Sequence, residues 1–154
     1  PEDDLTMTTA LYCSQRNPDA QMVAYFNDES LVSLLHKHCP NVECTPSVAV
    51  EMLAKSAFDP GSSLLHHDLL DINHGQAQYS VSIPVHIPPI KVEHIFETFK
   101  RKYRATLIGM SKAEEKLNIH VNPDLDLMLS PGDKIFYIAD ERIIDLNWHD
   151  FVER

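Results

Sequence analysis

The chain has 154 residues, which is enough for one domain or two small ones with a buried core. Its 13 basic and 23 acidic residues give a formal net charge of −10, which argues against a nucleic-acid partner, because proteins that bind nucleic acids are usually basic. No apolar run is long enough to span a membrane, and three cysteines suit a reducing cytosol better than a disulfide framework.

The first 46 residues predict half of an α/β sandwich. In chain order, the predicted elements are a helix over residues 5–16, a strand over 20–26, a helix over 28–38 and a strand over 41–46. Asp3 or Asp4 is the predicted N-cap of the first helix and Asn27 that of the second, because short polar side chains accept from free helix N–H groups. Two strands alone make an unstable parallel sheet, so we expect the other half upstream of Pro1 in a longer parent; no signal peptide is visible.

Residues 47–74 predict a helix–turn–helix arm. Its two helical segments cover residues 47–58 and 63–72. Asp59-Pro60-Gly61 separates them, and Ser62 can cap the second. This second helix is apolar on several sides, and an arm between two lobes has little of its own chain to bury against, so we expect a two-fold dimer interface here. The predicted interface residues are Met52, Leu53, Ala57, Phe58, Leu64, Leu65, Leu69 and Leu70.

Residues 75–143 predict a small α+β lobe of the order β-α-β-β-(β). Period-two alternation over residues 77–87 indicates a strand, which Pro84 places at an edge or a bulge, since proline has no N–H for a ladder. The elements that follow are an amphipathic helix over 91–105, strands over 105–110 and 117–121, and a hairpin of 127–129 with 135–138. The turn of this hairpin is Ser130-Pro131-Gly132-Asp133, where proline presets φ and glycine tolerates positive φ. The segment over residues 141–154 can be a helix with Ile144, Trp148, Phe151 and Val152 on one side.

One cluster has the residue types of a zinc site. His36, His38, Cys39 and Cys44 lie within nine residues. His36 and His38 are two positions apart on a helix and face different directions, which favours a helix end with exposed histidines and two small buried thiols. No metal site is therefore predicted, and these four residues are weak candidates.

Two further sets of polar residues allow a functional and an ordinary interpretation. They are His66, His67 and His74 in the arm, and Asp124, Asp126, Asp133 and Asp140 around the turn. Histidine titrates near neutrality, so the first set could make the interface sensitive to pH, but polar positions on a half-buried helix are favoured. The carboxylates could hold a cation through oxygen, but solvated turn chemistry is favoured.

The ordered set of segments resembles the RCK family (regulator of potassium conductance), which potassium channels and Trk-type uptake systems share. "NPDAQMVAYFNDES" and "TPSVAVEMLAK" resemble its N-terminal lobe, and "VSIPVHIPPIKVEHI" and "NPDLDLMLSPGDKIFYIADERI" its C-terminal lobe. The resemblance implies an α/β fold: a partial Rossmann-like lobe and a small α+β lobe joined by a helix–turn–helix crossover arm. It divides the chain into the second half of an RCK N-lobe (1–46), a crossover and dimerisation arm (47–74), an RCK C-lobe (75–143) and a C-terminal tail (144–154).

Two departures from the family pattern limit what the resemblance implies. The four glycines, Gly61, Gly75, Gly109 and Gly132, are too scattered for the glycine-rich phosphate loop that many members carry, so no cofactor-binding residue is predicted within this chain. Calcium-gated archaeal members place two carboxylates where this chain has Tyr25 and Asn27, a poor match to a hard dication. We therefore do not expect calcium gating at that position.

The resemblance implies a non-enzymatic regulatory domain on the cytoplasmic side of the membrane, which gates potassium transport in response to a ligand. The expected partners are a second copy or a higher ring, the membrane-spanning pore or transporter part, and a small-molecule or ion ligand. No G-x-S-x-G, H-E-x-x-H or C-x-x-C motif favours catalysis. The alternative is the C-terminal half of a nucleotide-dependent oxidoreductase, which the helix–strand alternation before residue 46 also allows.

Overall fold

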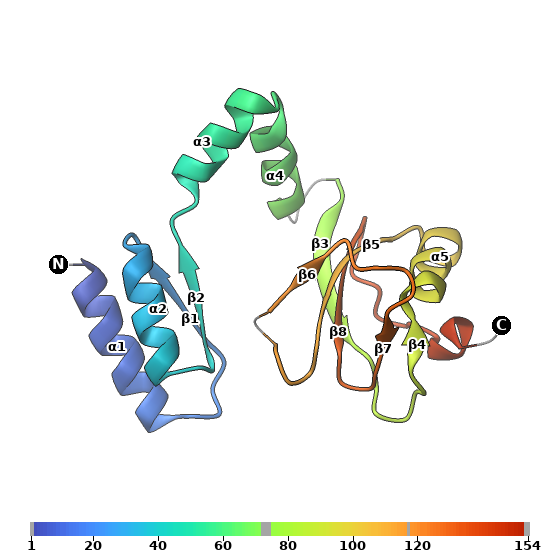
Figure 1. The fold of residues 1–154 in the computed structure, drawn as a ribbon, viewed down its shortest axis with the longest axis horizontal. Helices are drawn as coiled ribbons and strands as arrows, with labels where there is room; N and C mark the ends of the chain where they lie inside the picture. The colour runs from blue at the N-terminus through green and yellow to red at the C-terminus, as the bar shows by residue number, and fades with distance from the viewer. Residues whose placement is uncertain (1, 72–74, 117, 153–154) are drawn as a thin grey trace. The chain divides into compact units, whose positions relative to one another are not determined.

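The computed structural model describes residues 2–71, 75–116 and 118–152, which belong to two compact units (Figure 1). Unit 1 is Pro1–Ser63 and unit 2 is Leu64–Arg154, so the division falls within the predicted arm. The mixture of helices and strands confirms the expected α/β class. In the described part of the chain, no helix combines the length and the hydropathy that a membrane crossing needs.

Unit 1 alternates between helix and strand, as its sequence predicts. Its elements are α1 (Glu2–Arg16), β1 (Met22–Phe26), α2 (Glu29–His38), β2 (Val42–Pro46) and α3 (Ala49–Phe58). The strands β1 and β2 pair in parallel, from Met22 opposite Val42 to Phe26 opposite Pro46. The first two helices and both strands share one small core, made of Ala10, Ala24, Phe26, Leu35, Cys39 and Val42.

One face of this two-stranded sheet is uncovered. Burial alternates along β1: Ala24 and Phe26 are buried in the core, whereas Val23 and Tyr25 are exposed. Successive side chains of a strand point to opposite faces, so the exposed pair marks the second face of the sheet. Parallel sheets normally carry cover on both faces, and these apolar and aromatic side chains are typical of a covered face.

The helix starts in unit 1 differ from the predicted caps. Asp28, rather than Asn27, is the N-cap of α2, and its carboxylate accepts a hydrogen bond from the Ser30 backbone N–H (2.9 Å). Since α1 begins at Glu2, Asp3 and Asp4 lie in its first turn instead of capping it. Carboxylates in a first turn still stabilise a helix, because they face the positive end of its dipole.

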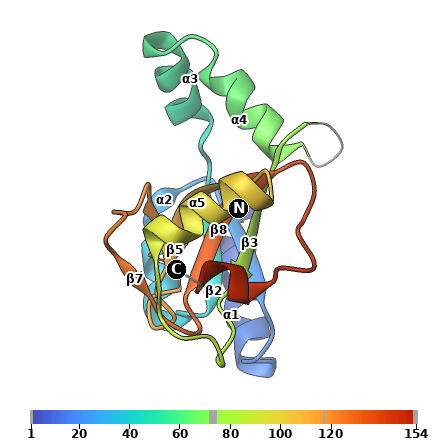
Figure 2. The ribbon, with the colours of Figure 1, turned by 90° about the vertical axis from the view of Figure 1, so that its right-hand side faces the viewer.

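Unit 2 is built on a four-stranded antiparallel sheet of order β3-β8-β5-β6. The elements from the arm onward are α4 (Ser62–Leu70), β3 (Ala77–Ser82), β4 (Ile90–Lys91), α5 (Val92–Lys102), β5 (Thr106–Ser111), β6 (His120–Val121), β7 (Met128–Leu129), β8 (Lys134–Ala139) and the 3-10 helix η1 (Trp148–Phe151). Figure 2 shows α5 in front of the sheet. It buries Val92, Ile95 and Phe99, whose spacing places them on one helix face, against the core of the unit.

The predicted turn at residues 130–133 forms, but the predicted hairpin does not. Gly132 has the positive φ (87°) that the turn requires, and the Asp133 N–H donates to the Ser130 carbonyl (3.1 Å). The flanking strands pair elsewhere: β7 pairs with β4, and β8 lies between β3 and β5. Backbone bonds to the start of α5, such as the Val92 N–H on the Leu127 carbonyl (2.9 Å), hold the first flank away from the second.

The strand β3 is an edge strand, as Pro84 predicts, but it is shorter than predicted. It ends at Ser82, and a turn follows in which the Ile87 N–H donates to the Pro84 carbonyl (3.2 Å). Since proline cannot donate to a ladder, the strand stops before it. Ile83 and Ile87 are buried in the core even though they lie outside the strand. The predicted strand over 117–121 is reduced to β6, and Leu117 lies outside the described residues.

The C-terminal segment does not form the helix that the sequence predicts. Among its described residues, the segment contains η1 and no other helix or strand. Phe151 is buried in η1, whereas Ile144 is exposed instead of sharing its side. The Ile143 N–H donates to the Tyr137 hydroxyl (3.1 Å), and the Asn147 side chain accepts from the His149 N–H (3.3 Å). In an α-helix these two N–H groups would donate to backbone carbonyls one turn earlier. Here they donate to side chains, and no α-helix forms before η1.

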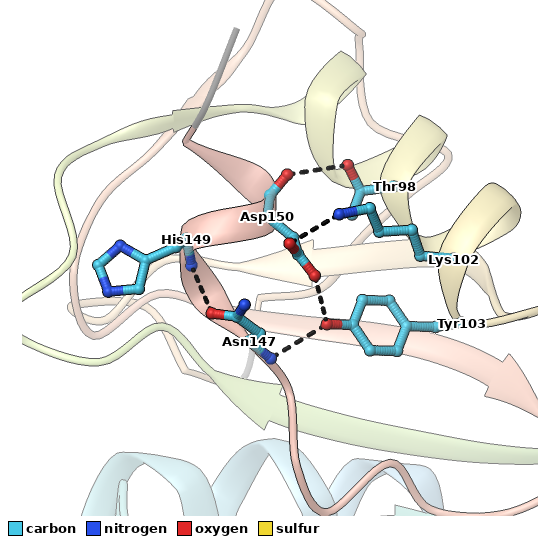
Figure 3. A network of polar contacts seen from close by, with 6 residues as sticks. All are labelled: Thr98, Lys102, Tyr103, Asn147, His149 and Asp150. Atoms are coloured by element: carbon cyan, nitrogen blue, oxygen red, sulfur yellow. Dashed lines mark hydrogen bonds and ion pairs between the residues drawn. The ribbon is translucent and has the colours of Figure 1, made fainter.

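A polar network attaches this segment to α5 (Figure 3). The Asp150 carboxylate accepts from Lys102 Nζ (2.7 Å) and from the Tyr103 hydroxyl (3.0 Å). The Tyr103 hydroxyl in turn accepts from the Asn147 backbone N–H (3.0 Å). Because charged groups strengthen such bonds, the network fixes the segment over the aromatic core beneath it.

Candidate assembly surface

The helix α3 exposes apolar side chains. Val50, Leu53 and Ala57 share one face by their spacing, and the neighbouring Phe58 is 86% exposed. Met52, also predicted to lie in the interface, is half-buried on the opposite side. Among the described residues of this helix none is buried, so its apolar face has no cover within unit 1.

The helix α4 is apolar around most of its circumference. Leu64, Leu65 and Leu70 are exposed, Leu69 is half-buried, and no described residue of the helix is buried. Successive residues are about 100° apart around a helix, so no single flat neighbour could cover these leucines. All eight residues of the predicted interface are thus exposed or half-buried, and exposed apolar surface of this kind is typical of interaction sites.

Two of the histidines for which a pH-sensitive role was the less favoured interpretation belong to the same helix. His66 and His67 are exposed on α4, and His74 lies outside the described residues. Adjacent positions on a helix point in different directions, so the two described histidines do not face one common partner. The favoured interpretation, that these histidines are polar positions of an arm helix, agrees with their exposure.

The four weak zinc candidates do not converge. His38 is exposed and His36 half-buried on α2, Cys39 is buried after its last turn, and Cys44 is half-buried in β2. Burial raises the pKa of the Cys44 thiol, which keeps it protonated and a poor metal ligand. Across the described residues, no group of three or more His, Cys, Asp or Glu side chains is placed to hold a metal ion.

Tyr25 and Asn27, at the end of β1, belong to a hydrogen-bonded cluster. The Asp3 carboxylate accepts from the Asn27 backbone N–H (3.1 Å), the Asn27 side-chain amide (3.1 Å) and the Asp28 backbone N–H (3.0 Å). The Tyr25 hydroxyl donates to the Asn27 side-chain oxygen (3.3 Å). The backbone bond from Asn27 is the largest cause that lowers the pKa of Asp3. The cluster joins the start of α1 to the connection between β1 and α2.

We expect Asp3→Ala to loosen this connection. Without the carboxylate, the Asn27 and Asp28 amides lose their acceptor and should exchange hydrogen faster than in the parent, while the thermal midpoint of unit 1 falls. Hydrogen exchange with mass spectrometry measures the first effect. Asp19→Ala, at an exposed aspartate of the same unit, is the control. Unchanged exchange at both amides would show that the cluster does not hold the connection.

The turn in unit 2 is organised by a buried aspartate. Asp133 is 3% exposed, so its predicted solvated role is wrong. Its carboxylate accepts from Lys112 Nζ (2.9 Å), the Ala113 N–H (3.0 Å) and the Ser130 N–H (2.9 Å). Because Asp133 follows Pro131 and Gly132, its sequence position suggested an exposed turn. The carboxylate is buried instead, where it accepts from the backbone N–H groups of Ala113 and Ser130.

The other aspartates of that set pair with groups of the protein or stay exposed. Asp126 forms an ion pair with Lys91 (2.7 Å), and Asp140 accepts from the Gln76 side chain. Asp124 is exposed. The set therefore does not converge on one point, and a shared cation is not favoured.

Comparison with known proteins identifies the fold. No protein-family model matches the sequence, and no curated protein matches it. The solved structure of the human SLO3 gating ring, which consists of RCK domains, matches 90% of this chain and 30% of its own, with a TM-score of 0.67 and 12% sequence identity. The chain has an RCK-type fold. The GsuK channel bound to NAD (88% and 23% covered, 15% identity, TM-score 0.39) and the GsuK RCK domain (89% and 28%, 16%, 0.37) also match, at scores too low to support this assignment.

The RCK-type chain spans less than a third of each of these solved chains, at 30%, 23% and 28% of their lengths. At such identities the likeness shows how the backbone is folded. The expected resemblance is thus confirmed for the fold.

Unit 2 of the RCK-type fold also contains two neighbouring hollows that the sequence did not predict. Their volumes are about 560 Å³ and 340 Å³, and both are lined by Asn122, Pro123 and Asp124. Asn122, which follows β6 directly, has a positive φ (52°). The Asn-Pro pair after an alternating strand was the available signal, because both residues favour turns.

Proposed function

We propose that this chain is a cytosolic, non-enzymatic regulatory domain of a potassium channel or potassium transporter, on the cytoplasmic side of the membrane. The observation that carries the proposal is the RCK-type fold, shared over 90% of the chain with a gating ring. In this role, the domain binds a ligand and passes a conformational change to the membrane part of its parent. A ligand does so only to the extent that it binds one conformation more tightly than another.

Assembly is the second part of the proposal. The arm, residues 47–74, dimerises two copies, and further contacts extend the dimer into a ring. Support comes from the eight interface residues, which are exposed or half-buried although they are apolar. A two-fold axis is the default for such a self-complementary surface.

Completion of unit 1 is the third part. We assign residues 1–46 to the second half of an RCK N-lobe and residues 75–143 to the C-lobe, with residues 144–154 as its tail. The exposed Val23 and Tyr25 support this assignment, because a parallel sheet normally carries a helical layer on each face, and two strands alone are too few for a stable parallel sheet. The first half of the N-lobe would supply the second layer and further strands.

The experiment that tests the proposal breaks the arm and follows both mass and transport. In Phe58→Asp plus Leu65→Asp, each charge enters an exposed apolar position of the arm. Burying these charges in an interface is costly, so light scattering should report half the mass of the dimer that the unchanged chain forms. In cells that express the full-length parent protein, rubidium uptake should lose its regulation.

The matched control is Val85→Asp plus Ile144→Asp, which adds the same charge at exposed apolar positions outside the arm. It should keep the parent mass and the parent uptake. An arm variant that keeps its mass refutes the interface. An arm variant of halved mass with unchanged rubidium uptake refutes the regulatory role, so the two parts of the proposal fail separately.

A further inference from the structure

The outer edge of β3 presents backbone groups that its neighbour β8 does not use. β3 is the first strand in the order β3-β8-β5-β6, so among the described strands only β8 pairs with it, along one edge. Just past the strand, the Ile83 N–H donates to the Asp133 carbonyl and the Ile83 carbonyl accepts from the Gly132 N–H, both at 2.8 Å. The backbone groups of Ile83 therefore face β8.

This orientation sets the direction of every backbone group in β3. Backbone groups alternate along a strand with a period of two, so those of Tyr79 and Val81 face β8, as those of Ile83 do. The N–H and C=O groups of Gln78, Ser80 and Ser82 face away from the sheet. These three residues carry no charge, and no proline interrupts the strand.

Such an edge is a template for another strand. Unpaired N–H and C=O groups in a regular row invite a strand of a second chain, and proteins usually block them with charges, prolines or covering segments. In this chain the strand of a second copy, laid antiparallel, offers the same three outward-facing residues. Pro84 limits pairing beyond Ser82 but leaves the strand itself open.

Arg142 lies on this edge. Its Nη1 atom donates to the Ser80 carbonyl at 3.2 Å, which is the middle one of the three outward carbonyls. Its guanidinium carbon also lies 5.2 Å from the centre of the Tyr79 ring, within the range of a cation–π interaction. Two contacts thus hold a charged, hydrated group where the carbonyl would accept from an incoming strand.

We propose that Arg142 guards the free edge of β3 and prevents antiparallel β3–β3 pairing between two copies of this chain. Arg142 blocks only this edge, so copies of the chain can still associate through other surfaces. This inference concerns unit 2 alone and does not depend on the proposed role in potassium transport or on the arm interface.

The test compares Arg142→Ala with Arg101→Ala in the full chain. Both variants remove one exposed arginine and change the net charge from −10 to −11. The greater negative charge opposes association, so charge alone cannot cause a gain in mass. Light scattering over a range of concentrations should show the mass of Arg142→Ala rising with concentration to at least twice the parent mass, while Arg101→Ala keeps the parent mass.

A second variant identifies the surface that associates. Ser80→Pro removes an N–H that faces away from β8, so it breaks no bond between β3 and β8 but disables the outer edge. Arg142→Ala plus Ser80→Pro should return to the parent mass. Hydrogen exchange gives an independent measurement: the amides of Gln78, Ser80 and Ser82 should exchange more slowly in associated Arg142→Ala than in the parent.

Three results would overturn the proposal. They are an Arg142→Ala variant with the parent mass at every concentration, an equal gain in Arg101→Ala, and association without slower exchange at the three outer amides. If Ser80→Pro destabilises the strand, the exchange measurement on the single variant still decides between this edge and another surface.

Discussion

Replacing Phe151 with alanine is expected to lower the free energy of unfolding of unit 2 by about 3–5 kcal/mol. Phe151 is 1% exposed, and its ring stacks on Tyr103 (centroids 5.8 Å apart, 3° between planes) and meets Phe99 edge-on (5.4 Å, 67°). Truncation removes these contacts and leaves a cavity beneath the polar network that Asp150 organises. Denaturant unfolding should show a lower midpoint with an unchanged slope.

The control for this prediction is Ile144→Ala in the same segment. Ile144 is 85% exposed, so its truncation should change the free energy of unfolding by no more than about 0.5 kcal/mol. If Phe151→Ala has as little effect as Ile144→Ala, the C-terminal segment is not part of the core of unit 2.

Replacing Asp133 with asparagine is expected to cost about 2–4 kcal/mol. The asparagine has nearly the same shape, but it loses the charge that faces Lys112 and places its own N–H₂ group among donors from Ala113 and Ser130. Asp145→Asn, at an exposed aspartate of the same unit, is the control and should be nearly neutral. A double-mutant cycle with Lys112→Met separates the ion pair from the backbone bonds, which remain when the lysine is removed.

The cost should depend on pH in a defined direction. Burial by itself raises the pKa of Asp133, but hydrogen bonds from Ser130, Lys112 and Ala113 outweigh it and hold the pKa below its ordinary value. A carboxyl whose pKa falls on folding stabilises the fold above its unfolded pKa and loses that contribution as the pH falls through the folded pKa. The difference between the parent and Asp133→Asn should therefore be full near pH 7 and shrink below about pH 4. A difference that persists unchanged at about pH 2 would show that the carboxylate charge is not the cause.

Elements with strong local periodicity could be predicted from the sequence. α5 follows from the spacing of Val92, Ile95 and Phe99, and the two strands of unit 1 follow from short apolar runs between turn residues. Whether such a segment is a helix or a strand depends on nearby residues, because each must place its apolar side chains on one face. The cap of α2 was misplaced by one residue since Asn27 and Asp28 are both good cap residues.

Strand pairing could not be predicted in the same way. Residues 127–129 and 135–138 look like a hairpin because they flank a strong turn, yet Leu129 pairs with Ile90. That choice depends on contacts between residues far apart in sequence, which no local pattern encodes. For the same reason, the sequence indicated that the arm leucines need cover but could not specify what covers them.

Asp133 and Arg142 illustrate what the sequence hides at the level of single side chains. Both are charged residues outside β8, one directly before it and one three residues after it, and both would be assigned to solvent from their type alone. One is buried because three donors converge on it, and the other is exposed but lies over a backbone carbonyl. Their roles follow from tertiary neighbours, so only the folded chain shows them.

The pairing of β3 with β8 joins Ala77 to Ala139, close to the two ends of unit 2. A ribosome makes the chain from its N-terminus, so β3 leaves the exit tunnel long before its partner has been synthesised. Throughout that interval the nascent strand has both edges open. Unit 2 can complete its sheet only after β8 has been translated, so the pairing of β3 is a late step in the synthesis of the chain.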